Sequence, residues 1–201
     1  MNRRSPRARL ISAALEEFST NGFTGTTMEA VAARARLSSE EMAEHFSDKR
    51  ALLSAALTLR DRTVRDEVWE GGAGEGWKGI EAWVELMRNN QQKPGTVRFF
   101  AELRLLATEH DHPAYDWLRG HYELVDEVVA RAVETGIKRG EIRAGTDPAA
   151  LARGLLAVIE GTEGRWLAAP QEVDPVAIVR DYVDLLAGAI TTESFRATLG
   201  R

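Results

Sequence analysis

Hydrophobic residues recur at every third or fourth position along most of the chain, which is the spacing of amphipathic α-helices. In the closing segment, Val176, Val179, Val183 and Ile190 fall along a single stripe. We find no segment whose alternation of polar and apolar residues predicts a strand. The pattern predicts an all-α fold of about nine helices, over residues 5–23, 28–35, 38–46, 48–69, 77–91, 96–109, 113–139, 147–168 and 174–190.

The predicted helix boundaries coincide with residues that typically start or stop helices. N-capping side chains stand at five of the starts: Ser5, Thr27, Asp48, Asp147 and Asp174. Gly22 follows the first helix and predicts its end. Residues 71–79, GGAGEGWKG, contain five glycines and predict a connecting loop. No strand precedes this loop and no Lys-Ser/Thr pair ends it, so it does not have the pattern of a phosphate-binding loop.

The charge distribution is uneven. The net charge is −5, but residues 1–60 contain nine Lys/Arg and seven Asp/Glu, whereas residues 61–201 contain 17 and 24. The absence of cysteine excludes disulfides, thiolate catalysis and cysteine-ligated zinc. No apolar run reaches the length of a membrane span, and the N-terminus MNRRSPRARL lacks the apolar core of a signal peptide. We therefore expect a cytoplasmic protein with its positive charge at one end.

The second and third predicted helices are joined by a tight turn near residues 34–37, which is helix-turn-helix spacing. Residues 22–57, GFTGTTMEAVAARARLSSEEMAEHFSDKRALLSAAL, resemble the N-terminal domain of the tetracycline-repressor-like (TetR) family of bacterial regulators. The matching positions are Gly22-Phe23, Thr26-Thr27, Val31-Ala32, Ser38, His45-Phe46, Lys49 and Ala51-Leu52-Leu53. A weaker resemblance to the family's C-terminal domain continues from residue 137.

The resemblance implies a ligand-responsive homodimer that regulates transcription. Residues 1–50 would form the DNA-binding domain, the helix over 48–70 would connect, and residues 51–201 would bind ligand and dimerise. Two reading helices would enter successive major grooves of a palindromic operator. A small organic molecule bound in the C-terminal domain would release the repressor from DNA.

The predicted reading helix, LSSEEMAEHF at residues 37–46, is acidic. Ser38 and Glu41 have the spacing of a capping box, and glutamates in a first turn are favoured by the helix dipole. At 100° per residue, Glu40, Ala43 and Glu44 point outward. Family members typically present a basic residue, a glycine and a tyrosine on this face, and this chain has Ser39, Glu40 and Ala43 instead. Glu40 or Glu44 could accept a hydrogen bond from cytosine N4, or could belong to a solvated face. The alternative to DNA binding is a helical dimer that binds a small molecule or protein and whose acidic helix no longer reads DNA.

Candidate DNA contacts combine this outward face with a basic flank that could fix position on the phosphates. The predicted set is Arg3, Arg4, Arg7, Thr27, Arg36, Ser38, Ser39, Glu40, Ala43, Glu44, His45 and Lys49.

The C-terminal part is rich in large aromatic side chains. Aromatic positions on helical stripes are by default core. By analogy with the family, a pocket between helices would bind an organic, possibly aromatic, ligand. The predicted lining is Trp83, Met87, Arg98, Phe99, Phe100, Glu102, Leu103, Trp117, His121, Glu163 and Trp166.

The last two long helices each carry an apolar stripe. Ordinary intramolecular packing would account for the stripes, whereas the family packs such a pair against its symmetry mate as a four-helix bundle. The predicted interface residues are Leu155, Ile159, Val179, Tyr182 and Leu186.

No constellation of residues predicts an enzyme. His110 and His112, in EHDHP, could bind a metal, but no further ligand motif is near, which favours a solvated turn. There is no nucleophile-elbow pattern and no dinucleotide fingerprint. We expect neither a metal nor a cofactor.

Overall fold

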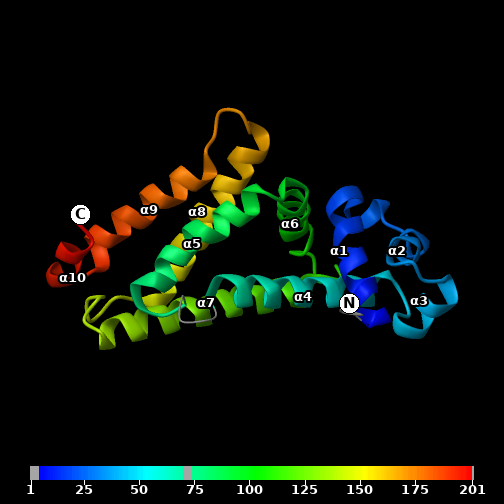
Figure 1. Ribbon diagram of the computed structural model, residues 1–201, viewed down its shortest axis with the longest axis horizontal. Helices are drawn as coiled ribbons and strands as arrows, with labels where there is room; N and C mark the ends of the chain where they lie inside the picture. Colours follow the sequence, from blue (N-terminus) through cyan, green and yellow to red (C-terminus); the bar gives the residue numbers. More distant parts are fainter. Residues whose placement is uncertain (1–4, 70–73, 201) are drawn as a thin grey trace. The chain divides into compact units, whose positions relative to one another are not determined.

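The computed structural model describes residues 5–69 and 74–200, and within these ranges every regular element is a helix (Figure 1). The ten helices are α1 (Pro6–Gly25), α2 (Met28–Ala35), α3 (Ser39–His45), α4 (Lys49–Trp69), α5 (Gly76–Gln91), α6 (Pro94–Leu106), α7 (Tyr115–Lys138), α8 (Pro148–Ala168), α9 (Pro175–Ile190) and α10 (Glu193–Thr198). The predicted all-α fold is confirmed. The tenth helix was not predicted, because six residues are too few to show a helical period. No described helix is long and apolar enough to cross a membrane.

The predicted caps form through local hydrogen bonds. Ser5 accepts from the Ala8 amide at 3.3 Å, and Thr27 accepts from the Ala30 amide at 3.1 Å. Asp48 accepts from the Ala51 amide at 2.9 Å, and this bond lowers the pKa of its carboxyl. Asp147 and Asp174 cap α8 and α9 in the same way. The five predicted helix starts are therefore confirmed.

Gly22 kinks α1 rather than ending it as predicted, since the helix continues to Gly25. The φ of 69° at Gly22 lies in the left-handed region, where glycine meets no steric penalty. The predicted loop over 71–79 is shorter at its C-terminal end, because α5 already begins at Gly76. Residues 71–73 lie outside the described ranges.

The described chain divides into two compact units. Unit 1 contains residues 5–63 and 93–120, and joins α6 and the first residues of α7 to the N-terminal helices. Phe18 of α1 stacks on Phe99 of α6 with ring centroids 5.7 Å apart. A Cβ at Gly95 would lie 2.9 Å from the backbone oxygen of Ser19, so this glycine permits α6 to approach α1 closely. The unit is larger than the predicted DNA-binding domain over residues 1–50, and that functional boundary stays a prediction.

Unit 2 contains residues 64–92 and 121–200. Its core is built where α5 and α8 pack on α9, and two indole rings, Trp77 and Trp83, are 1% and 2% exposed within it. A Cβ at Gly154 of α8 would lie 2.8 Å from the Tyr182 hydroxyl of α9, so the two helices approach closely there.

Candidate nucleic-acid interface

The turn between α2 and α3 is set by a residue in the left-handed conformation. Arg36 has a φ of 56°, and its amide donates to the carbonyl oxygens of Ala32 and Ala33. A side chain in this region costs on the order of 1 kcal/mol or more and persists where surrounding contacts hold it. Leu37 closes the turn by donating its amide to the Ala32 carbonyl at 3.0 Å.

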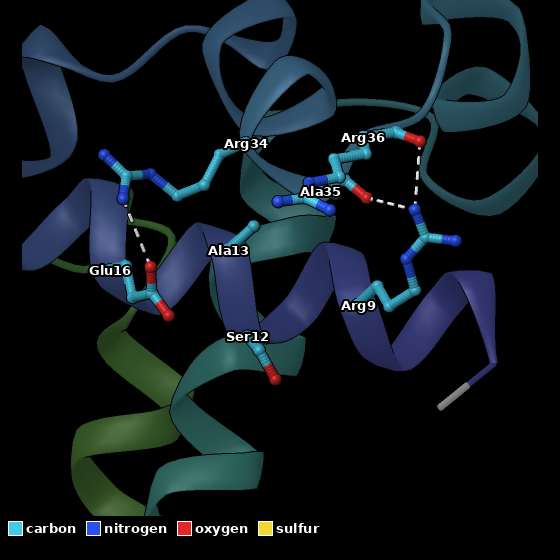
Figure 2. Close-up of a pocket in the computed structure, with 7 residues that line it drawn as sticks. All are labelled: Arg9, Ser12, Ala13, Glu16, Arg34, Ala35 and Arg36. Atoms are coloured by element: carbon cyan, nitrogen blue, oxygen red, sulfur yellow. Dashed lines mark hydrogen bonds and ion pairs between the residues drawn. The ribbon is translucent and has the colours of Figure 1, made fainter. Parts of the chain in front are cut away.

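Arg9 of α1 provides such contacts. Its Nη2 donates to the carbonyl oxygen of Ala35 and, at 2.9 Å, to that of Arg36 (Figure 2). The guanidinium therefore holds the first helix to the helix-turn-helix turn at two consecutive carbonyls. Arg9 was not among the predicted DNA contacts, and nothing in the sequence near Arg9 pairs it with positions 26 and 27 residues later.

A groove of about 240 Å³ lies beside this contact, between α1 and the end of α2. Its lining residues are Arg9, Ser12, Ala13, Glu16, Arg34, Ala35 and Arg36, drawn in Figure 2. Arg34 forms ion pairs with Glu16 at 3.2 Å and with the mostly buried Glu17 at 2.5 Å. These pairs raise the pKa of Arg34, first through the Glu17 hydrogen bond.

The α3 helix has one buried and one exposed face, as its periodicity predicts. Met42 and the following Phe46 are 2% and 5% exposed and belong to the unit 1 core. Ser39, Glu40, Ala43 and Glu44 are exposed. The core thus holds the inner face and leaves the outer face free for another molecule.

The first turn of α3 uses two of its three glutamates. Ser38 accepts from the Glu41 amide at 3.1 Å, and Glu41 accepts from the Ser38 amide at 2.8 Å, which confirms the capping box. Glu40 accepts hydrogen bonds from its own amide and from the Ser38 hydroxyl, and these lower the pKa of its carboxyl. Both carboxylates therefore stabilise the positive end of the helix.

Lys49 lies at the start of α4 and is turned toward the chain. Its Nζ donates to the carbonyl oxygens of Phe23 at 2.8 Å, Thr26 at 2.9 Å and Thr24 at 3.4 Å. The same atom lies 4.6 Å from the centre of the Phe23 ring. An ammonium group has three N–H donors, and these carbonyls engage all three. A phosphate contact by Lys49 stays a prediction and would require one of these bonds to be exchanged.

The other predicted basic contacts differ in accessibility. Arg7 is exposed and its guanidinium lies 5.1 Å from the Phe46 ring centre, beside α3. Arg36 is exposed, Thr27 is exposed with its hydroxyl used as a cap, and His45 is half-buried. Arg3 and Arg4 lie outside the described residues. Arg7 and Arg36 are therefore the described arginines of the predicted set that are exposed, and their phosphate contacts stay a prediction.

The predicted ligand-lining residues are divided between the two units. Phe99, Phe100, Leu103 and the half-buried Trp117 belong to unit 1, whereas Arg98 and Glu102 of α6 are exposed. In unit 1, Trp117 Nε1 donates to Asp61 at 2.7 Å and Arg60 lies 4.4 Å above the Phe100 ring centre. Trp83, Met87, Glu163, Trp166 and the half-buried His121 belong to unit 2.

Glu163 is a charged side chain inside unit 2. It is 3% exposed and accepts a hydrogen bond of 2.8 Å from Asn90 of α5. Trp166 follows one turn later on α8, and Trp83 precedes Asn90 by two turns on α5. Helical spacing of three and seven residues places each tryptophan on the same helix face as its polar neighbour.

Three of the predicted dimer contacts are packed within their own chain. Leu155, Ile159 and Val179 are at most 5% exposed and belong to the unit 2 core. Tyr182 and Leu186 are partly buried against the same core. Leu185, which was not predicted, is 71% exposed on α9.

The histidines of EHDHP make contacts with neighbouring side chains and backbone. The His110 ring stacks on Tyr115 with centroids 4.4 Å apart, and His112 Nδ1 accepts from the Ala114 amide at 3.2 Å. Within residues 5–69 and 74–200, no group of three or more His, Asp or Glu is arranged to hold a metal ion.

Both the N-terminal and the C-terminal part of the chain match models of known protein families. Residues 10–56 match the model of bacterial regulatory proteins of the tetR family, and residues 78–188 match that of the BetI-type transcriptional repressor C-terminal domain. The DNA-binding transcriptional repressor TetR of Mycobacteroides abscessus is 32% identical over 114 residues, which are 57% of this chain and 58% of that protein. The match thus spans less than two thirds of the curated relative.

Solved structures share the fold over nearly the whole chain. A putative TetR-family regulator from Rhodococcus sp. has a TM-score of 0.77 at 23% identity and covers 93% of this chain and 98% of its own. A putative transcriptional regulator from Saccharomonospora viridis, in complex with choline, has a TM-score of 0.73 at 20% identity with the same coverage. Since the C-terminal model alone covers more than half of the chain and the N-terminal model covers the helix-turn-helix, the chain belongs to the TetR family of bacterial transcriptional regulators.

Proposed function

We propose that this protein is a dimeric transcriptional repressor that binds a palindromic operator through α3 and leaves it when a small organic molecule binds. The observation that carries the proposal is the α3 helix itself. Its inner face is held by Met42, its start by the capping box, and the turn before it by Arg9. A rigid helix with an exposed outer face is what reading base edges in a major groove requires.

For the dimer, we propose the outward surface of α9 together with the neighbouring surface of α8. Leu155, Ile159 and Val179 face the chain's own core, so they would support this surface from behind. Among the side chains of unit 2 that the structure describes, Leu185 is the most exposed large apolar one, with Tyr182 and Leu186 beside it on α9. A twofold interface would cover this apolar area.

For the ligand, we propose an organic cation that binds in unit 2. The buried carboxylate of Glu163, which accepts a hydrogen bond from Asn90, would supply negative charge, and the indole rings of Trp83 and Trp166 would supply faces that attract cations. The choline complex of the Saccharomonospora viridis relative is consistent with this class of ligand. The ligand must bind the DNA-incompetent arrangement more tightly than the competent one in order to release the operator.

The test is fluorescence anisotropy of the purified protein with the DNA that flanks its own coding region, at two salt concentrations. A random duplex of equal length is the control. The proposal predicts tighter binding to the flanking DNA than to the control. If neither this DNA nor any sequence from a random pool is bound with preference at low salt, the proposed function is wrong.

A further inference from the structure

The three glutamates of α3 do not have equivalent roles. Glu41 accepts the Ser38 amide in the capping box, and Glu40 accepts its own amide and the Ser38 hydroxyl. Both carboxylates are thereby folded back onto the helix start. Their presence has a complete explanation in the stability of the helix.

Glu44 has no such explanation. It is the sixth of the seven residues of α3 and therefore lies in the last turn, where the helix dipole disfavours a negative charge. Its side chain is exposed, and within the described ranges no hydrogen bond or ion pair engages its carboxylate. An exposed carboxylate that lowers the stability of its own helix is explained if it contacts another molecule.

The outer face around Glu44 leaves space for a base pair. Ala43 precedes it with a methyl group, and Glu40 lies one turn earlier on the same face, already bonded to the helix start. The two large side chains of this segment, Met42 and Phe46, are buried on the opposite face. On the exposed face of α3, the small side chain of Ala43 therefore leaves the Glu44 carboxylate open to a groove that receives this helix, while the neighbouring His45 is half-buried.

We propose that Glu44 reads a cytosine in each operator half-site by accepting a hydrogen bond from its N4 amino group. A carboxylate has only acceptors, and cytosine presents a donor at the major-groove edge, whereas guanine O6 and N7 and thymine O4 are acceptors. Adenine presents N6 as a donor, but its N7 acceptor lies beside it and repels a carboxylate. This assignment rests on the proposed operator binding and names the residue that gives it sequence preference.

The test is selection of random duplexes by the full-length protein, carried out with the wild type, Glu44→Gln and the matched control Glu40→Gln. Glutamine pairs with adenine through N6 and N7, so Glu44→Gln should change one position per half-site from cytosine to adenine. Glu40→Gln should keep cytosine there. On the selected operator, exchange of that cytosine for thymine should weaken wild-type binding by about 10-fold or more.

The outcomes separate this assignment from the proposed function. A wild-type motif that Glu44→Gln leaves unchanged at every position would overturn the role of Glu44 while the proposed operator binding stands. A wild type that selects no motif would overturn the proposed function, and the assignment with it. If Glu44→Gln were to misfold, Glu44→Ala tests the assignment instead: it should lose the preference for cytosine at one position per half-site and keep the rest of the motif.

Discussion

The Nζ of Lys49 lies 2.8 Å from the carbonyl oxygen of Phe23 and 4.6 Å from the centre of the same residue's ring. One cation thus satisfies carbonyls at the C-terminal end of α1 and covers an aromatic face. This relationship ties α4 to the corner between α1 and α2, the corner from which the helix-turn-helix begins.

Replacement of Lys49 by methionine should therefore destabilise the protein. We expect the free energy of unfolding to fall by about 1–3 kcal/mol, because backbone carbonyls lose their charged donor. Urea denaturation measures this loss. If Lys49 also contacts a phosphate, as predicted from the sequence, the slope of log affinity against log salt should fall by about 0.9 in this variant; an unchanged slope would contradict that contact.

Replacement of Arg36 by glycine should stabilise the fold. Its φ of 56° is strained for a residue with a Cβ, and glycine removes that strain, so we expect a gain of about 1 kcal/mol. Ala33→Gly, on the exposed side of the same helix, is the matched control and should lose about 0.5–1 kcal/mol. Thermal unfolding of both variants measures these changes in stability. If both glycine variants lose the same stability, Arg36 is not strained.

A shallow salt dependence is expected for operator binding. Arg9, Arg34 and Lys49 are bound to carbonyls or carboxylates of their own chain, which leaves few cations for phosphates among the residues of this part that the structure describes. Each phosphate contact adds about 0.9 to the slope of log affinity against log salt. In titrations between about 50 mM and 200 mM salt, this slope should be smaller in Arg7→Gln and Arg36→Gln than in the wild type, and unchanged in Arg34→Gln.

Stability should decrease as the pH falls below the ordinary histidine range. Burial, and then the nearby Arg50 charge, lower the pKa of His112 from its usual value of 6.5. The unfolded chain therefore binds a proton more readily than the folded one, so the contribution of His112 is complete above about pH 6.5 and is lost as the pH falls through the folded pKa. Urea midpoints between about pH 5 and 8 should fall less steeply toward acid in His112→Asn than in the wild type. His110→Asn is the control in the same loop, and an unchanged profile in His112→Asn would contradict this account.

The Glu163→Gln variant should fold as the wild type does and should bind organic cations more weakly. Glutamine retains an oxygen that can accept from Asn90 while removing the buried charge. Titration with choline, followed by tryptophan fluorescence, should show saturable binding in the wild type and weaker binding in the variant. Equal affinity in both proteins would exclude Glu163 as the partner of the cation. Glu85→Gln, at an exposed position of α5, is the matched control.

Much of the fold could be predicted from the sequence because its determinants are local. A cap such as Thr27 acts on an amide three residues away, and the capping box joins Ser38 to Glu41 over the same interval. The inward side of α3 follows from the spacing of Met42 and Phe46 on a helix. The residues that carry the family resemblance stand in these local positions as well, so the fold and the position of the helix-turn-helix were both predictable.

The tertiary structure decided what each side chain is paired with. Arg9 and Lys49 bind carbonyls 23 to 27 residues away, and charge patterns alone could not reveal these contacts within the chain. The apolar stripe of α9 was visible, but only packing showed that Val179 faces its own chain while Leu185 remains exposed. Helical periodicity shows whether a side chain lies on the buried or the exposed face of its helix. Which residue it contacts there depends on the packing of segments that are distant in sequence.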